Sequence, residues 1–417
     1  MFDASNTRLG LRSEKATIID RMPGHIEHLY VHIPFCPAKC DYCAFVTHIG
    51  SLKLVEPYLA ALCREAELRH RQRSGGPFKT LYFGGGTPSM LAPEQLWSLI
   101  QHVEAVMGLS SSCEITVECH PATVSLPKLL GCRNAGVNRL SFGAESLDDG
   151  ELAALGRTHR SADVARAVDQ ARAAGFTDIA LDLMYGIPQQ TLESWRNTLE
   201  RVIQMEVTHL SLYPLSIEPK TVFAKRKWRF GLDVPEDESV VAMYELACGV
   251  LRDAGYEHYE VANWAKPGHR CLHNLAYWRN AEFHGLGTGA HAYLHPYRTE
   301  NDTHTGSYIK RVLAGMDPVT VSEQVDVHTR AEETMMLGLR LLRDGPDLGA
   351  VERDLGRHPL EQLKDEIGPL IDAGLISLTA DRLVLRETAV PVANEVWERL
   401  LLSRLPARGS TFATPVM

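Results

Sequence analysis

The segment HIPFCPAKCDYC, residues His32–Cys43, carries the most informative pattern in this chain of 417 residues. Its cysteines, Cys36, Cys40 and Cys43, follow the spacing C-x3-C-x2-C, so one short loop offers three thiolates. A fully ligated [4Fe–4S] cubane takes four cysteine ligands, and a loop with three leaves one iron open to a chelating molecule. The spacing therefore favours an iron–sulfur cluster with one open coordination position.

Zinc is the main alternative for this loop, because C-x2-C also begins zinc sites. A structural zinc ion needs four ligands, usually from two paired halves, and Cys271 and His273 are the residues that could supply the second half. The other cysteines are scattered and do not form a disulfide framework: Cys63, Cys113, Cys119, Cys132 and Cys248. Reduced thiols and a metal site fit this distribution better.

Short β-rich runs alternate with amphipathic helical stretches from His28 to about Leu215. The expected strands are Leu29–Ile33, Thr80–Phe83, Glu114–Glu118, Arg139–Phe142, Asp178–Leu183 and His209–Tyr213. Helices with apolar residues at three- and four-residue spacing are expected at Glu56–His70, Pro93–Val106, Ala162–Ala174 and Leu192–Gln204. This alternation predicts an α/β fold, a partial (β/α)6 barrel that is similar to a TIM barrel.

The chemically distinctive residues all follow or close the expected strands. They are the cysteine loop, the glycine loop Gly84–Pro88, Glu118, Glu145, Asp182 and Tyr213. Loops at the carboxyl ends of barrel strands converge and build active sites, whereas the opposite end contributes stability. We therefore expect these six features to form one site.

The chain divides into five expected parts. Residues 1–27 form an N-terminal extension, 28–262 the barrel, 263–326 a connecting segment, 327–405 a C-terminal domain and 406–417 a tail. The C-terminal domain is expected to be α+β and similar to a winged helix. Its predicted elements are helices at Arg330–Arg343, Gly349–Leu355 and Pro359–Ala373, strands at Leu375–Ser377 and Leu383–Leu385, and a last helix at Val390–Leu402.

Composition is that of a globular protein, with 45% hydrophobic and 23% charged residues. The net charge of −9 argues against broad nucleic-acid binding, which depends on Lys and Arg. One basic run, Lys225–Arg229, is interpreted as a solvated loop, with an RNA or anion contact as the alternative. Neither a membrane span nor a secretory signal is expected, which points to the cytoplasm.

The cysteine loop followed by the glycine loop resembles the radical S-adenosylmethionine superfamily, in its coproporphyrinogen-dehydrogenase-like (HemN/HemW) branch. Further matching segments are Tyr30–Phe35, Gly136–Arg139, Leu155–His159, Gly186–Pro188 and Tyr259–Asn263. The resemblance implies that S-adenosylmethionine chelates the open iron through its amino and carboxylate groups. One electron, from a flavodoxin- or ferredoxin-like low-potential donor, then splits the molecule into methionine and a 5′-deoxyadenosyl radical.

The resemblance also implies the contacts of the first S-adenosylmethionine. Tyr42 would lie on its adenine, and the backbone of Gly85, Gly86 and Thr87 would meet its amino group. A glycine loop by itself has an ordinary explanation, a tight turn. Its position after the second strand of the expected barrel makes the cofactor interpretation stronger.

Five further residues have roles implied by the same resemblance. Glu118 would reach the first S-adenosylmethionine, and Tyr30 would lie near its methionine end. Glu145, Arg157 and Asp182 match positions that contact a second S-adenosylmethionine in several relatives. The alternative is an ion pair of Arg157 with Asp182 or Glu145 that only orders the barrel rim.

Two features distinguish members of the branch. Porphyrinogen dehydrogenases carry another cysteine two residues after the third ligand, where this chain has Phe45. The segment His273–Trp278 resembles the H-N-x-x-Y-W motif of HemW-like haem chaperones. The resemblance implies that His273 ligates haem iron while Tyr277 and Trp278 cover a porphyrin face. The alternative is a packed core in which the histidine is satisfied.

An enzymatic alternative is kept, because class C radical methyltransferases resemble the same fold and use two S-adenosylmethionine molecules to methylate or cyclopropanate sp² carbons. Departures from the usual pattern fit such divergence: His120 stands for asparagine, Glu145 for glutamine, and Gly287–Ala292 for the pattern Gly-Pro-Gly-Ala-His-Ser. The acceptor is then a small molecule instead of haem, and no catalytic side chain is assigned.

Overall fold

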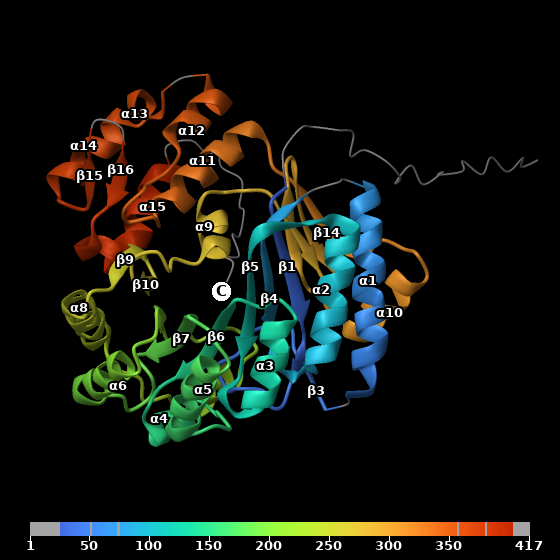
Figure 1. Cartoon of the computed structure of the whole chain (residues 1–417). Coiled ribbons are helices and arrows are strands. Elements are labelled where there is room, and N and C mark those ends of the chain that lie inside the picture. Colours follow the sequence, from blue (N-terminus) through green and yellow to red (C-terminus); the bar gives the residue numbers. More distant parts are fainter. Residues whose placement is uncertain (1–25, 51, 73–75, 357, 380–381, 403–417) are drawn as a thin grey trace, which may run out of the picture.

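The computed structural model describes residues 26–402, except 51, 73–75, 357 and 380–381 (Figure 1). The expected extension up to residue 25 and the expected tail, 406–417, lie outside the described residues. A twelve-stranded sheet forms the body of the molecule, and a smaller helical unit lies above one end of it in Figure 1.

The six expected strands are confirmed as a consecutive parallel series inside this sheet. They are β1 (His28–Ile33), β4 (Phe78–Gly85), β5 (Leu109–Cys119), β6 (Arg139–Glu145), β7 (Asp178–Tyr185) and β8 (His209–Pro214). Leu, Val, Ile and Phe residues of these strands are buried on the helix-covered side, as expected for a sheet with crossover helices. The parallel strands and crossover helices of the partial barrel predicted from the alternation are present.

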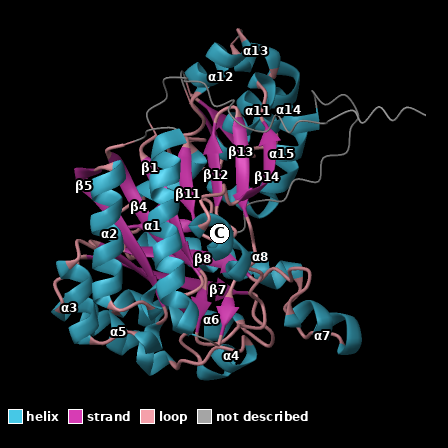
Figure 2. Cartoon of the chain, turned by 90° about the vertical axis from the view of Figure 1, so that its right-hand side faces the viewer, coloured by secondary structure: helices cyan, strands magenta, loops and turns pink. Residues whose placement is uncertain are grey.

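Helices lie on the outer side of the strands, as Figure 2 shows for α1 and α2. The crossover helices are α1 (Val55–Gln72), α2 (Pro93–Met107), α3 (Leu126–Asn134), α4 (Asp149–Ala154), α5 (Ser161–Ala173), α6 (Leu192–Gln204) and α8 (Asp237–Asp253). In α2, for example, Leu96, Leu99 and Val103 are buried while Trp97 is exposed. This three- and four-residue spacing is the reason why the sequence pattern located the helices.

The segment 263–326 does more than connect two units, because it extends the sheet at both edges. Its elements are β10 (Asn263–Ala265), α9 (Leu272–Trp278), β11 (Phe283–Leu286), β12 (His291–Leu294), β13 (Tyr297–Asn301), α10 (Thr305–Leu313) and β14 (Val319–Gln324). β11 pairs in parallel with β1, and β10 pairs with β8 and with β9 (Glu257–Glu260). The boundaries of the five parts remain predictions.

A buried carboxylate attaches this segment to the barrel. Glu65 of α1 is fully buried and accepts hydrogen bonds from Tyr308 Oη at 2.6 Å, Gly287 N at 2.8 Å and Asn301 Nδ2 at 2.8 Å. Arg69 completes the group with an ion pair at 3.1 Å. Because every partner is supplied, the charge can be buried without a large desolvation cost.

The C-terminal unit has its own apolar core, separate from that of the barrel. It consists of α11 (Val327–Gly338), α12 (Leu348–Leu355), α13 (Pro359–Gln362), α14 (Lys364–Asp372), β15 (Ile376–Leu378), β16 (Leu383–Leu385), the 3-10 helix η4 (Glu387–Val392) and α15 (Ala393–Leu402). Helices followed by an antiparallel hairpin agree with the expected winged-helix-like arrangement. The single helix expected at Pro359–Ala373 is divided between Gln362 and Lys364.

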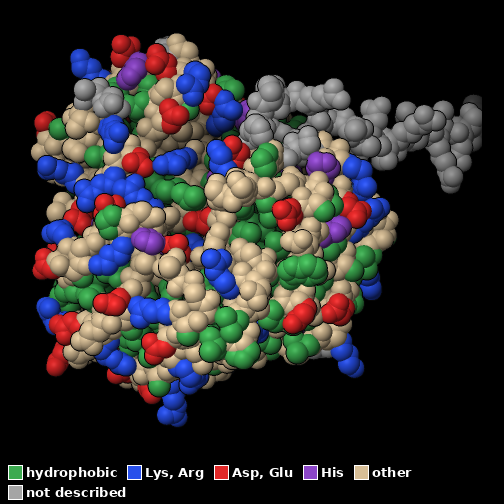
Figure 3. All heavy atoms as spheres, viewed as in Figure 1, with side chains coloured by type: hydrophobic (Ala, Val, Ile, Leu, Met, Phe, Trp, Pro, Cys, Tyr) green, Lys and Arg blue, Asp and Glu red, His purple; other side chains and the backbone are tan. Residues whose placement is uncertain are grey.

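The short strands β2 (Phe35–Cys36) and β3 (His48–Ile49) bracket the cysteine loop. The basic run expected as a loop is instead a helix, α7 (Val222–Phe230), whose start is capped by Thr221 Oγ1 accepting from Ala224 N at 3.1 Å. Charges of both signs are interspersed over the face in Figure 3. Among the described residues, no helix combines the length and apolar character needed to cross a membrane.

Candidate functional site

The cysteine loop holds three free thiols close together at the carboxyl end of β1. Cys36 Sγ lies 3.4 Å from Thr87 Oγ1, and Cys40 Sγ lies 3.4 Å from Arg157 Nη1. Burial, with charge repulsion from Cys40 and Cys36, raises the pKa of the Cys43 thiol to about 11. Three thiolates at this place therefore need a strong positive centre, and bound iron would supply one.

Backbone hydrogen bonds fix the loop to the rest of the barrel mouth. Asp41 N donates to Leu155 O at 3.1 Å, and Phe223 N donates to Asp41 O at 3.0 Å. A Cβ at Gly156 would lie 3.0 Å from the Asp41 side chain, and the φ of this glycine is +72°. The segment 155–159, noticed in the sequence only as a family motif, thus serves to position the loop.

His32 is a positioning residue that the sequence analysis did not assign. Its Nε2 lies 2.9 Å from Val46 O, and because a carbonyl can only accept, Nε2 carries the proton. Nδ1 then accepts from the Tyr30 hydroxyl at 3.1 Å. Burial lowers the pKa of His32 to about 4, so the neutral ring that this pattern requires is the stable form near pH 7.

The glycine loop is required by close packing as well as by any ligand. A Cβ on Gly85 would lie 2.3 Å from the His32 ring, and one on Gly86 would lie 2.6 Å from the Pro34 backbone. The φ of Gly85 is +110°, a conformation that favours glycine. Thr87, the next residue, is buried against the cysteine loop. The tight-turn explanation therefore holds in this structure beside the cofactor interpretation.

Two carboxylates face each other inside the barrel. Glu118 accepts from Tyr82 Oη at 2.9 Å and from Gly85 N at 3.0 Å, and Asp182 accepts from Ser141 Oγ at 3.0 Å. Burial and the charge of Asp182 raise the pKa of Glu118 to about 7. Burial also raises the pKa of Asp182 to about 6. A cationic group of a bound molecule would relieve this repulsion.

Arg157 is a cation that contacts both the cysteine loop, through Cys40 Sγ, and a rim carboxylate, Glu145. Its Nη1 lies 3.7 Å from Glu145 Oε1, and its Nη2 donates to Gly143 O at 2.5 Å. Glu145 has a φ of +62°, and burial raises its pKa. The structure therefore forms one of the two rim pairs considered from the sequence, Arg157 with Glu145. Asp182 is held by Ser141 instead.

His273 lies at the other end of the barrel, where it is 1% exposed. Its Nδ1 is 2.7 Å from Thr80 Oγ1, and its Nε2 is 2.9 Å from Tyr277 Oη. Burial lowers the pKa of the ring to about 3. Both ring nitrogens are occupied, so His273 is not open to haem iron in this conformation. The structure shows the satisfied core that the sequence analysis kept as the alternative.

Helix α9 closes the amino ends of the strands. Glu114 accepts from Leu272 N and His273 N, each at 3.0 Å. Glu114 pairs in register with Thr80, near the amino end of β4. Cys271 Sγ also points to Glu114, at 3.6 Å. Cys271 and His273 therefore cannot complete a zinc site with the cysteine loop, which lies at the opposite ends of the strands.

The chain resembles known proteins over nearly its whole length. The model of the radical SAM superfamily matches residues 30–202, and that of the HemN C-terminal domain matches residues 325–392. Heme chaperone HemW of Bacillus subtilis is 35% identical over 374 residues, covering 89% of this chain and 98% of that protein. HemW of Mycobacterium tuberculosis (strain H37Rv) is 34% identical, covering 91% and 96%.

The chain belongs to the HemW family within the radical SAM superfamily. The solved structure of coproporphyrinogen III oxidase (HemN) from Escherichia coli shares the fold, with a TM-score of 0.80, 22% identity and 91% of each chain covered. Membership of the superfamily implies a [4Fe–4S] cluster and reductive cleavage of S-adenosylmethionine. The three neighbouring thiols and the repelling carboxylates fit those groups.

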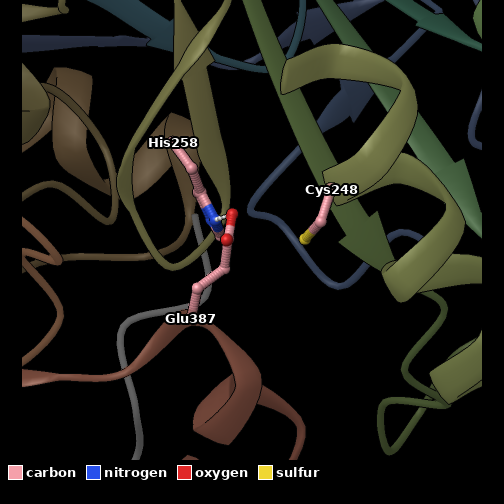
Figure 4. Close-up of side chains that lie close together, drawn as sticks. All are labelled: Cys248, His258 and Glu387. Carbon is pink, nitrogen blue, oxygen red and sulfur yellow. Dashed lines mark hydrogen bonds and ion pairs between the residues drawn. The ribbon is translucent and has the colours of Figure 1, made fainter. Parts of the chain in front are cut away.

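A second group of metal-binding side chains lies outside the barrel mouth of this HemW-family chain. Cys248 of α8, His258 of β9 and Glu387 of η4 place ligand atoms within 4.8 Å of one another (Figure 4). His258 Nδ1 is 3.0 Å from Glu387 Oε1, and Arg252 Nη2 is 2.6 Å from Glu387 Oε2. Because the guanidinium already neutralises the carboxylate, we interpret the group as an ion-pair joint between barrel and C-terminal unit.

Proposed function

We propose that this chain is a haem chaperone that carries a [4Fe–4S] cluster and binds S-adenosylmethionine. The observation that carries the proposal is the similarity to a protein named heme chaperone HemW, which extends over 98% of that protein. Phe45 supports it, because porphyrinogen dehydrogenases resembling this chain have a cysteine there. Haem or a haem-requiring client is the proposed partner.

Cys36, Cys40 and Cys43 are the proposed cluster ligands. When bound, the cluster would supply one electron to the sulfonium of S-adenosylmethionine. The chain's own contribution is to orient that molecule and to balance its charge. Glu118 and Asp182, whose pKa values are raised mainly by burial, would receive a cationic amino group or sulfonium.

The remaining proposed contacts surround the same opening. Tyr42 would lie on the adenine, because its ring lies among Glu145, Arg157 and Cys40 at the mouth. Tyr30, held by His32, would lie near the methionine end. The backbone carbonyls of Gly85, Gly86 and Thr87 would accept from the amino group, while Gly85 N keeps Glu118 as its acceptor.

We propose one S-adenosylmethionine per chain. Arg157 is engaged with Glu145, Gly143 and Cys40, and a second molecule bound by Arg157 would have to replace some of these contacts. The class C methyltransferase alternative requires that second molecule. Equilibrium dialysis on the anaerobically reconstituted chain measures the stoichiometry, and two bound molecules with S-adenosylhomocysteine among the products would favour methyl transfer.

Haem titration of the reconstituted chain tests the chaperone proposal. A Soret shift that saturates near one haem per chain is expected, and its absence would contradict haem binding. His273→Ala separates two locations for the haem. Loss of the shift in a variant that stays folded would mean that α9 opens to let His273 reach iron, whereas an unchanged shift assigns the axial ligand to another residue.

A further inference from the structure

Helix α7 gathers positive charge on a chain of the opposite net charge. Lys225, Arg226, Lys227 and Arg229 are all exposed, although the chain carries −9 overall. Trp228 among them is 83% exposed, the largest value among the exposed large hydrophobic residues of the described chain. Figure 2 shows α7 projecting from the side of the barrel. An isolated solvated helix does not explain the exposed indole.

The base of α7 rests on the cysteine loop. Phe223 is fully buried in a small apolar cluster with Leu155 and Met184, against which Tyr42 packs. Its backbone N donates to Asp41 O at 3.0 Å. Arg226 Nη1 adds an ion pair with Asp41 Oδ2 at 2.9 Å. Asp41 directly follows Cys40, so the helix begins beside a proposed cluster ligand.

The outer cations of α7 are left free for a partner. Within the described part of the chain, no carboxylate forms an ion pair with Lys225, Lys227 or Arg229, whereas Arg226 has Asp41. Trp and Arg are the residue types that contribute most to protein interfaces, particularly where a large aromatic side chain can be desolvated. The combination is that of a docking surface and not of a packed helix.

We propose that α7 is the docking surface for a small acidic one-electron carrier protein that reduces the cluster. The inference rests on the proposed cluster and S-adenosylmethionine chemistry. One electron passes from the reduced flavin or iron–sulfur centre of the carrier to the cluster, so the carrier is oxidised by one electron and the cluster is reduced by one. No proton or group is transferred in this step.

Two physical arguments favour this partner. Electron transfer between proteins becomes steeply slower with distance, so a donor has to dock close to the loop that holds the acceptor, and α7 begins there. Opposite charge accelerates encounter and selects the partner, an effect that weakens as ionic strength rises. A basic helix with a central tryptophan therefore suits an acidic carrier surface with an apolar centre.

Calorimetric titration of the reconstituted full chain with oxidised flavodoxin, and separately with an oxidised [2Fe–2S] ferredoxin, tests the docking surface without turnover. Lys225→Glu/Lys227→Glu is expected to weaken binding by about tenfold at low salt, and Trp228→Ala by a similar factor. Raising the salt from about 50 mM to about 500 mM should weaken wild-type binding and abolish the difference from the charge variant.

Matched variants control for charge and for exposed aromatic surface. Arg353→Glu/Lys364→Glu changes the net charge equally but lies in the C-terminal unit, and Trp97→Ala removes a half-exposed indole from α2. Both are expected to bind the carrier as the wild type does. If they weaken binding as much as the α7 variants, the proposal is wrong. Binding of an RNA oligomer, but of neither carrier, through α7 would also overturn it.

Stopped-flow reduction of the cluster provides the second readout. The α7 variants should be reduced about tenfold more slowly by the reduced carrier, and at the wild-type rate by dithionite, which needs no docking surface. Equal rates with the carrier would contradict the proposal. The α7 variants should still bind haem as the wild type does. Failure of the docking surface is therefore distinguishable from failure of the chaperone function.

Discussion

At the carboxyl ends of the strands, burial raises the pKa of both Glu118 and Asp182, and the charge of Asp182 adds to the shift at Glu118, whereas at the amino ends His273 has a partner for each ring nitrogen. The carboxyl ends thus leave charge and thiols to be balanced by a bound molecule. The amino ends satisfy their polar groups internally, as Glu114 does for the start of α9. A conspicuous motif at the amino ends is therefore internally packed, whereas the carboxyl ends carry the proposed ligand site.

Removal of a thiol at the carboxyl ends of the strands should have the largest effect, loss of the cluster. Cys40→Ala leaves two of the three proposed ligands, so the broad iron–sulfur absorbance after anaerobic reconstitution should be lost completely. Cys63→Ala, on α1, is the control and should keep the absorbance. A Cys40 variant that retains the wild-type spectrum would show that Cys40 is not a cluster ligand. The carboxyl ends would then no longer differ from the amino ends as the cluster-binding end.

At the amino ends of the strands, His273→Ala should lower stability while sparing the cluster. The change removes the His273 partner of Tyr277, leaves Thr80 with His28 alone and opens a cavity, which together lower the free energy of unfolding by about 4 kcal/mol. Urea unfolding measures the loss. His102→Ala, on α2, is expected to cost about 1 kcal/mol or less. A His273 variant as stable as the wild type would contradict the packing role.

The pH dependence of stability should report the burial of the Asp182 carboxyl at the carboxyl ends of the strands. The pKa of Asp182 is about 6 in the fold and 3.8 in an unfolded chain, so its stabilising contribution is complete below pH 3.8 and is lost as pH rises through 6. Asp182→Asn removes this loss, worth up to about 3 kcal/mol. The ligand-free variant should therefore become progressively more stable than the wild type between pH 4 and pH 7.

Thermal unfolding at a series of pH values, without S-adenosylmethionine, measures the difference. Ser141 can still donate to the amide oxygen of asparagine, so the variant keeps its main hydrogen bond. Parallel stability curves for the two proteins would show that the pKa of Asp182 is not raised in the fold.

Tyr82→Phe should give the smallest effect. The Tyr82 hydroxyl donates to Glu118 and lowers the pKa of that carboxyl, so its loss leaves more Glu118 protonated at pH 7. Affinity for S-adenosylmethionine should fall by about threefold at pH 7 and recover by about pH 9, where Glu118 is ionised in both proteins. Tyr297→Phe, on β13, is the control. A pH-independent loss of affinity would point to a packing defect.

The sequence predicted the parts of the fold that depend on local patterns. The strands β1 and β4–β8 were located because apolar runs and helical periodicity alternate, and the cysteine loop was identified from spacing alone. Pairing between distant segments was not predictable in this way. β11 joins β1 across about 250 residues, and α7 became a helix because Phe223 has an apolar cluster to enter.

His273 shows the same limit at the level of the site. Its residue type and motif allowed either a haem ligand or a packed core, and only the positions of Thr80 and Tyr277 decide between them in this conformation. His32 was missed for the corresponding reason. Its role depends on the carbonyl of Val46, which the fold brings back to β1 after the cysteine loop.

The most direct test of the account is the electron paramagnetic resonance spectrum of the reconstituted, reduced chain with and without S-adenosylmethionine. The account predicts a [4Fe–4S] signal, from about four irons per chain, that changes on addition of S-adenosylmethionine because an open iron is chelated. The same change should persist in His273→Ala, at the opposite end of the barrel. A signal that S-adenosylmethionine leaves unchanged, or a chain that binds zinc in place of iron, would contradict it.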